Sequence, residues 1–169
     1  MEFRYFRDPK GFAFLVDSPQ PCSICRKVGI WLDTGGYPGI NEIDCICEDC
    51  LKSGKLIDLE IEANQYCDDD SEESVTLMYK TPALPTWQET AWPLINGEFP
   101  VFERIASKQD FENKDEFLKS FSGAQEVSEV EWLWDMLPEK KLNSYKGAGD
   151  VSVYLFTLEG NKYWVWDAS

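Results

Sequence analysis

The chain has 169 residues, with 31 acidic and 16 basic side chains, no histidine and a formal net charge of −15. Contacts with a phosphate backbone need clustered Lys and Arg, and the sequence has no such cluster, so we expect no nucleic-acid partner. The lack of histidine removes the commonest general base and every Ser–His or Cys–His nucleophile pair. Because there is no run of about 18 apolar residues and residues 1–5 lack the apolar centre of a signal peptide, we expect a cytoplasmic protein without a membrane partner.

The length suits one compact domain with its own core. Helices and antiparallel strands are both predicted along the chain, so the expected fold class is α+β. We expect a single domain over residues 1–169. Its parts are a zinc-ribbon-like part (1–56), strands with a Trp- and Pro-rich loop (57–105), two helices (106–140) and a C-terminal β-hairpin (150–167).

The N-terminal part is predicted to contain short strands. Residues 11–16 and 28–32 are apolar runs between turn residues, which favours strands. Residues 35–39 form a Gly-rich loop, and residues 51–55 suit a single helical turn. Asp33-Thr34-Gly35 matches the tripeptide of aspartic proteases. Their mechanism needs two such carboxylates that share a proton, and the sequence has no second tripeptide of this kind. We therefore expect a strand that ends in a glycine turn.

Two Cys-x-x-Cys motifs give the strongest signal in the sequence, and their members are Cys22, Cys25, Cys47 and Cys50. Each motif can present two thiolates to one tetrahedral ion, and Zn²⁺ takes four sulfurs in closed structural sites. A cytosolic protein keeps its thiols reduced, which argues against disulfides, and a redox motif would need a βαβ pattern. We predict one structural Zn²⁺, whose four ligands leave no position for water or substrate.

Two further cysteines have separate interpretations. Cys45 offers an alternative to Cys47 as a ligand, but only Cys47 has the two-residue spacing with Cys50. Cys67 lies beside a run of aspartates and is predicted to be free.

Residues 56–79 contain eight acidic side chains and no Lys or Arg. Ile57, Leu59 and Ile61 recur at period two, with acidic residues between them, and predict a half-exposed strand. Val75, Leu77 and Tyr79 alternate in the same way and predict another strand. The charge-dense residues 68–74 between them suit a solvated loop.

The acidic side chains allow three interpretations: a solvated surface, a hard-cation site, or a mimic of a nucleic-acid backbone. The ligand order of a calcium-binding EF-hand is absent. A mimic would suit an inhibitor of a nuclease toxin, because charge complementarity gives fast association and specificity. The candidate partner-binding residues are Asp58, Glu60, Glu62, Asp68, Asp69, Asp70, Glu72 and Glu73.

Residues 81–93 are rich in Pro and Trp, which predicts an ordered, irregular loop packed by Trp87 and Trp92. Glu89 between the two indoles makes this loop a candidate pocket. Two helices are predicted next, because residues 113–116 and 128–131 have the spacing of capping boxes. Strands at 151–156 and 162–166 then flank a turn and predict a closing β-hairpin.

Several stretches taken together resemble the CbrC family, small bacterial proteins whose name is tied to tolerance of a nuclease-type colicin. The resemblance spans nearly the whole chain. It rests on Phe3-Arg4-Tyr5, Asp8-Pro9, the two Cys motifs, Thr81-Pro82, Trp87-Gln88-Glu89, Trp92-Pro93, Tyr154-Leu155-Phe156 and Lys162-Tyr163.

The chain departs from the family pattern at two places. The family has a His-Cys pair and a further Cys after the Trp-Pro, where this chain has residues 94–100. It has a Cys-x-x-Cys in the final hairpin, where this chain has residues 158–161. The resemblance therefore implies a cytosolic, zinc-binding protein linked to toxin tolerance or immunity, and it places any second metal site in doubt.

Three functional hypotheses follow. The first is a non-enzymatic protein that neutralises a toxin with a basic surface by covering it. The second is an enzyme with a carboxylate, Glu89, in an aromatic pocket of Trp87 and Trp92. The third is a regulatory zinc module that binds another cytosolic protein.

Overall fold

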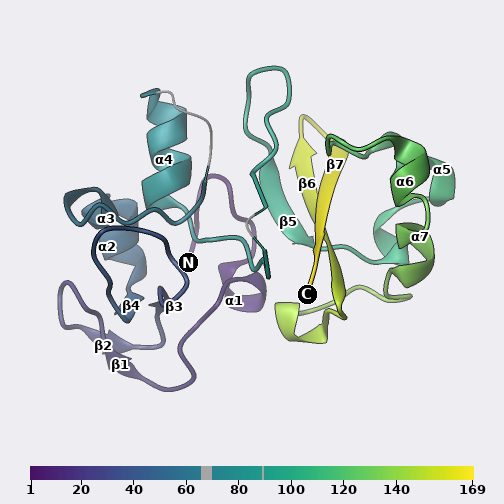
Figure 1. The fold of residues 1–169 in the computed structure, drawn as a ribbon. Coiled ribbons are helices and arrows are strands. Elements are labelled where there is room, and N and C mark those ends of the chain that lie inside the picture. The colour runs from purple at the N-terminus through teal and green to yellow at the C-terminus, as the bar shows by residue number, and fades with distance from the viewer. Residues whose placement is uncertain (66–69, 89) are drawn as a thin grey trace. The chain divides into compact units, whose positions relative to one another are not determined.

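The computed structural model describes residues 1–65, 70–88 and 90–169. The chain divides into two compact units, Met1–Pro85 and Thr86–Ser169 (Figure 1). Short helices and antiparallel strands make up the fold, so the α+β class is confirmed. The single domain expected over residues 1–169 stays a prediction. Within the described residues, no helix has the length and hydropathy needed to cross a membrane.

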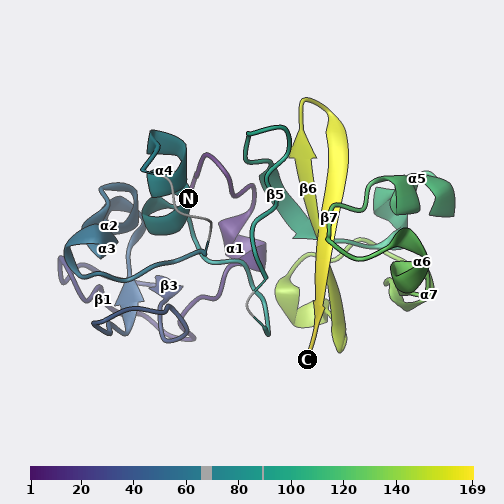
Figure 2. The same ribbon diagram turned by 45° about the horizontal axis from the view of Figure 1, so that its top comes forward.

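The first unit combines two small antiparallel sheets with short helices (Figures 1 and 2). One sheet pairs β1 with β2 and the other pairs β3 with β4. The elements are α1 (Pro9–Phe12), β1 (Gln20–Pro21), β2 (Val28–Gly29), β3 (Leu32–Asp33), β4 (Cys45–Ile46), α2 (Glu48–Lys52), α3 (Lys55–Asp58) and α4 (Glu72–Lys80).

Capping residues explain why two predicted strands of this unit are helices instead. The prediction of a strand over residues 11–16 is wrong at its start, because Asp8 accepts from the Gly11 N–H and Pro9 opens α1, which ends at Phe12. Leu15 makes only an isolated bridge with Leu32. The prediction for Val75 to Tyr79 is also wrong, because Ser71 accepts from the Ser74 N–H and caps α4.

The predicted strand over Ile57 to Ile61 is wrong as well. Gly54, at a φ of 75°, lets the chain turn directly from α2 into α3, and Ile57 donates its N–H back to the Gly54 carbonyl. Only Ile61 forms a bridge, with Gly39. The alternating pattern therefore reflects one helical turn followed by a bend rather than a pleated strand.

The predicted strand over residues 28–32 is divided into β2 and β3. The indole of Trp31 folds back over Gly29, where a Cβ atom would lie 2.5 Å from the ring, so the chain bends between the two strands. At the end of β3, Asp33 accepts from the Gly35 N–H over 2.9 Å. This is the strand end and glycine turn that the Asp33-Thr34-Gly35 tripeptide predicted.

The second unit is an antiparallel sheet of order β5–β6–β7 with helices on one face (Figures 1 and 2). The closing hairpin was predicted from the sequence, whereas β5 was missed. The elements are β5 (Val101–Ile105), the 3₁₀ turn η1 (Lys108–Asp110), α5 (Lys114–Lys119), α6 (Val127–Val130), α7 (Leu133–Met136), the 3₁₀ turn η2 (Tyr145–Gly147), β6 (Val151–Leu158) and β7 (Asn161–Ala168).

The caps of the helices were predicted with unequal success. Asn113 accepts from the Glu116 N–H and begins α5, as expected. The second predicted helix is two short helices, α6 and α7, and its capping box lies between Glu126 and Glu129, two residues before the expected one. Pro138 follows the last turn, as its lack of an N–H requires.

Trp164 of β7 is the centre of the core beneath these helices. Its ring is fully buried and stacks on Phe117 of α5, with centroids 4.3 Å apart, and its Nε1 donates to the Phe117 carbonyl. The opposite face of the sheet holds a second aromatic group, in which Trp92 packs edge-on against Phe156 and Phe102. Both faces of the sheet are therefore covered by aromatic side chains.

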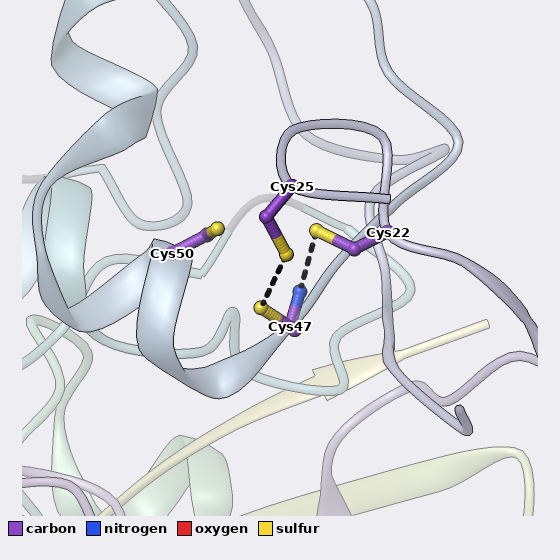
Figure 3. Close-up of side chains that lie close together, drawn as sticks. All are labelled: Cys22, Cys25, Cys47 and Cys50. Atoms are coloured by element: carbon purple, nitrogen blue, oxygen red, sulfur yellow. Dashed lines mark hydrogen bonds between the residues drawn. The ribbon is translucent and has the colours of Figure 1, made fainter. Parts of the chain in front are cut away.

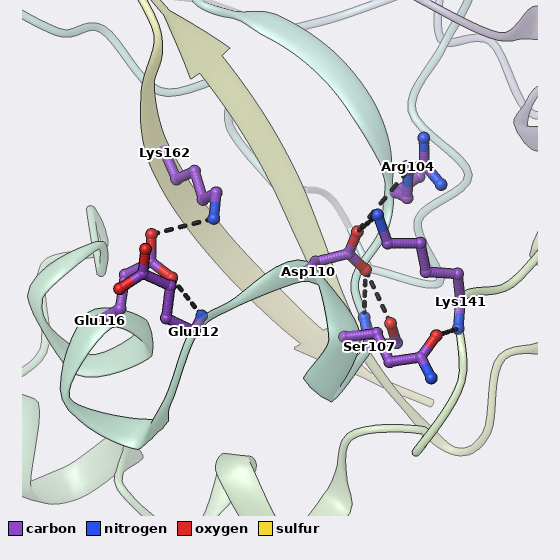
Figure 4. A network of polar contacts seen from close by, with 8 residues as sticks. Arg104, Ser107, Asp110, Glu112, Glu116, Lys141 and Lys162 are labelled. Atoms are coloured by element: carbon purple, nitrogen blue, oxygen red, sulfur yellow. Dashed lines mark hydrogen bonds and ion pairs between the residues drawn. The ribbon is translucent and has the colours of Figure 1, made fainter.

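Buried and half-buried carboxylates fix the ends of these elements (Figure 4). Asp110 accepts from both the N–H and the hydroxyl of Ser107 at 2.8 Å, and Lys141 Nζ lies 3.5 Å from its other oxygen. Glu116 of α5 accepts from the Glu112 N–H and, at 2.9 Å, from Lys162 Nζ on β7. The Glu112 N–H and the Lys162 cation hold the pKa of Glu116 below its usual range.

We predict that Glu116→Gln destabilises the protein by about 0.5–1 kcal/mol near pH 7, because the ion pair with Lys162 is lost. Since the folded-state pKa is lowered, the contribution of Glu116 is present above the unfolded-state pKa of about 4.3 and is lost as the pH falls through the folded-state value. Urea unfolding at several pH values should show the difference from wild type shrinking towards acid pH. The control is Glu112→Gln, which leaves the backbone N–H in place, and a pH-independent difference would contradict the prediction.

Candidate metal centre

The four cysteines of the two motifs come from two turns that the local sequence shapes (Figure 3). Cys22 follows β1, and its carbonyl accepts from the Arg26 N–H, which closes a tight turn around Cys25. Arg26 completes this turn at a φ of 66°. Cys47 is the N-cap residue of α2, and Cys50 lies inside that helix, so the second pair is presented by a helix start.

The sulfur atoms of Cys22, Cys25, Cys47 and Cys50 all lie within 4.8 Å of one another. Cys25 Sγ and Cys47 Sγ are 3.6 Å apart. Four sulfurs at the usual Zn–S distance of 2.3 Å would be about 3.8 Å apart at the corners of a tetrahedron, so the cluster has the size that a metal ion needs. Three of the four side chains are buried and Cys25 is exposed. These residues could therefore hold a metal ion, as the motifs predicted.

Backbone donors favour a negative charge at this cluster. Burial raises the pKa of the Cys22 thiol, but N–H groups of Cys25, Cys47 and Ile24 outweigh it and lower that pKa to about 7. The Cys47 N–H lies 3.3 Å from Cys22 Sγ. Burial raises the pKa values of Cys47 and Cys50 instead. The Cys25 thiol raises both values further, because a second charge in the cluster is costly. A cation within the cluster would remove that cost.

Cys45 lies outside the cluster. It is buried in β4, and its Sγ lies 3.5 Å from the Pro21 carbonyl. Burial raises the pKa of its thiol. The described cluster contains Cys47 instead, in agreement with the spacing argument. Cys67, predicted to be free, lies outside the described residues.

A family model described as "Uncharacterised protein family (UPF0167)" matches residues 1–166. The chain belongs to this family. Comparisons with curated proteins and with solved structures give no match. The UPF0167 match covers both cysteine motifs and nearly all of both units, and its description assigns no activity to the metal centre.

The predicted partner-binding residues lie mostly on the surface of the first unit. Asp58 ends α3, and Glu60 follows at a φ of 53°. Glu72 and Glu73 occupy the first turn of α4, where the helix dipole favours them. Asp58, Glu60, Asp70, Glu72 and Glu73 are exposed and Glu62 is half-buried, whereas Asp68 and Asp69 lie outside the described residues. Their role as an interface stays a prediction.

The two indoles of the pocket expected around Glu89 lie in different environments, and the pocket itself stays a prediction. Trp92 is buried in the core and donates to the Pro100 carbonyl, but the side chain of Trp87 is 64% exposed. Glu89 lies outside the described residues. Trp92 lines a groove together with its neighbours Thr90, Ala91 and Pro93. The other walls are residues 122–125, Val165 and Trp166. Sequence reasoning missed this groove, because its walls come from three segments that no motif connects.

Proposed function

We propose that this is a non-enzymatic, zinc-binding cytoplasmic protein of CbrC type that confers toxin immunity or tolerance. It binds a bacterial toxin with a basic surface, a nuclease being the first candidate, and neutralises it by covering that surface. The observation that carries the proposal is the exposed acidic surface on the unit that contains the four-cysteine cluster.

Zinc is the metal that the donor set favours. Four thiolates suit a tetrahedral Zn²⁺ or an iron site, and Zn²⁺ in this sphere has all its positions filled by protein. Such an ion supplies structural stability when bound, because it joins the turn at Cys22 to the start of α2. The role assigned to the centre is therefore to hold the acidic surface in shape.

Charge is the feature that favours a basic partner. The formal net charge of −15 would attract a positively charged surface over long range and raise the association rate. Asp58, Glu60 and Glu72 are exposed and available for contact with such a surface, and Glu73 is exposed beside Arg4, whose Nη2 lies 3.6 Å from its carboxylate. Carboxylates at these positions would also pair with Lys and Arg in the cleft of a nuclease, as phosphates do.

The product of the neighbouring gene is the first toxin to test. We predict that Asp58→Asn, Glu72→Gln and Glu73→Gln together slow association by roughly tenfold or more at low salt, with less effect on dissociation. Stopped-flow mixing at several salt concentrations measures this. The matched control, Glu112→Gln with Asp115→Asn and Glu159→Gln, removes the same charge from the second unit and should change the rate by about twofold or less. If the protein neither binds an adjacent toxin nor protects cells from it, the proposal is wrong.

A further inference from the structure

The outer edge of β7 is partly covered by the chain that follows α5. The Trp164 N–H donates to the Ser120 carbonyl and the Trp164 carbonyl accepts from the Ser122 N–H, both over 2.9 Å. The backbone groups of Trp164 therefore point away from β6. Residues of an antiparallel ladder alternate in this respect, so the N–H and carbonyl of Trp166 point in the same outward direction.

Two hydrogen bonds, one across the ladder from Trp166 and one farther along β7, support the outward orientation of its backbone groups. Val153 faces Trp166 across the ladder, and its carbonyl accepts from the Ala106 N–H at 2.7 Å. The backbone groups of Val153 therefore point towards β5, and those of Trp166 point away from β6. Farther along β7, the Ala168 carbonyl accepts from Gln88 Nε2 at 3.0 Å. The edge is thus occupied at both neighbouring outward residues. At Trp166 itself, no described residue pairs with the outward N–H or carbonyl.

A groove of about 340 Å³ adjoins this gap, and we name it the edge groove. It is lined by residues 90–93, residues 122–125, Val165 and Trp166. Several of these residues are small, so the space beside the strand stays open. Glycine is required at position 123, since a Cβ there would lie 2.4 Å from the Phe121 ring.

The indole of Trp166 adds a second unmet hydrogen-bonding group. Its Nε1 is buried and has no partner among the described residues. The Trp132 ring lies edge-on to it, with centroids 5.6 Å apart, and Trp132 is 45% exposed. A buried indole N–H without a partner is costly, and the outward backbone groups of the same residue are free to pair with a chain bound along the edge.

The charge beside the edge groove indicates what kind of chain would bind. Residues 120–139 contain five acidic side chains and no Lys or Arg. Two of them, Glu131 and Glu139, pair with Lys114 and Lys108. Asp135 makes no ion pair with any described residue. Glu126 directly follows the lining residue Gln125 and is exposed, and the whole chain carries a net charge of −15. A cationic side chain would be attracted to such a surface and could lie over the half-exposed Trp132 ring.

We propose that the edge groove binds an extended segment of another protein, one residue of which pairs with Trp166 between the occupied positions at Trp164 and Ala168. The segment carries a Lys or Arg next to an apolar residue. Main-chain hydrogen bonds to Trp166 supply affinity, and the edge groove selects the apolar side chain, as in other cases of strand addition. A second copy of this chain fits less well, because it would bring another net charge of −15 to an acidic surface. The site lies in the second unit and does not depend on the acidic surface of the first.

A random-peptide library displayed on phage and selected on the whole protein supplies the probe. We expect the selected peptides to combine Lys or Arg with apolar residues in alternation. The backbone of the best peptide is then N-methylated at one position at a time. Methylation of the residue that pairs with Trp166 should reduce affinity roughly tenfold or more, and methylation of its neighbours should have little effect. Ala124→Trp, which fills the edge groove, should abolish binding, whereas the control Asn143→Trp on an exposed loop should not.

Hydrogen exchange provides a test that does not rely on a variant. The Trp166 backbone amide should exchange faster than those of Val165 and Asp167 in the free protein, and the peptide should protect it. The proposal is overturned if no peptide is selected, if Ala124→Trp binds as well as wild type, or if N-methylation has the same effect at every position. Self-association in sedimentation experiments that Ala124→Trp abolishes would identify a second copy as the occupant and would also overturn it.

Discussion

Cys50→Ser is expected to lose the metal and much of the stability of the first unit. The cluster has four sulfur donors, all within 4.8 Å, and a serine hydroxyl stays protonated and does not replace a thiolate. Metal binding in small zinc modules contributes on the order of 10–16 kcal/mol, which is as large as the whole stability of a typical domain. Elemental analysis of the purified protein should give one equivalent of zinc for wild type and none for Cys50→Ser.

The matched control for this experiment is Cys45→Ser. Cys45 is buried in the same part of the chain but lies outside the cluster, so this variant should keep one equivalent of metal. Limited proteolysis should then cut Cys50→Ser, but not Cys45→Ser, at sites before Pro85. Native wild-type protein without metal, or a Cys50→Ser variant that retains a full equivalent, would contradict the assignment of the centre. Equal metal loss in both variants would show that Cys45 is a ligand.

Trp164→Ala is expected to destabilise the second unit by about 3–5 kcal/mol. The ring is fully buried, stacks on Phe117 and contacts Phe121, and its Nε1 donates to the Phe117 carbonyl. Truncation therefore leaves a cavity and removes one of the two donors to the Phe117 carbonyl, which keeps the Ser120 N–H at 3.1 Å. Urea unfolding followed by far-UV circular dichroism measures the loss, and near-UV dichroism reports the loss of aromatic packing.

Trp87→Ala is the control, because it removes the same side chain from a position that is 64% exposed. Its effect should lie within about 0.5 kcal/mol of wild type. If the two substitutions cost the same, Trp164 is not the centre of this core. If Trp164→Ala does not fold, Trp164→Phe can replace it, because Phe keeps the stacking on Phe117. Its loss of stability should lie between those of Trp164→Ala and Trp87→Ala.

The parts of the molecule that the sequence predicted are those determined by local chemistry. The spacing within each Cys motif places two thiols on one turn, and because one ion takes four sulfurs, two such motifs predicted a shared cluster. Asn113 and the turn at Glu159-Gly160 determined α5 and the hairpin in the same way. These features required no knowledge of what packs against them.

The parts that were missed depend on contacts between distant segments or on caps that were given too little weight. Val75, Leu77 and Tyr79 alternate as in a strand, but Ser71 and two glutamates in the first turn favour a helix, and the helix buries Leu77. β5 was missed because its residues become strand-like only when paired with β6. The edge groove combines three separate segments, so no single stretch of sequence indicates it.

Asp167 determines the shape of one wall of the edge groove from inside the sheet. One of its oxygens accepts from the Tyr154 hydroxyl at 2.6 Å, and the other accepts from the N–H groups of Trp87 and Gln88 at 2.8 and 3.1 Å. A single buried carboxylate therefore joins the middle strand to the loop that leads into residues 90–93. Asparagine at this position would keep the volume but lose one acceptor, so the loop would loosen while the hairpin stayed paired. The accessibility of the groove is thus linked to a side chain that no ligand would touch.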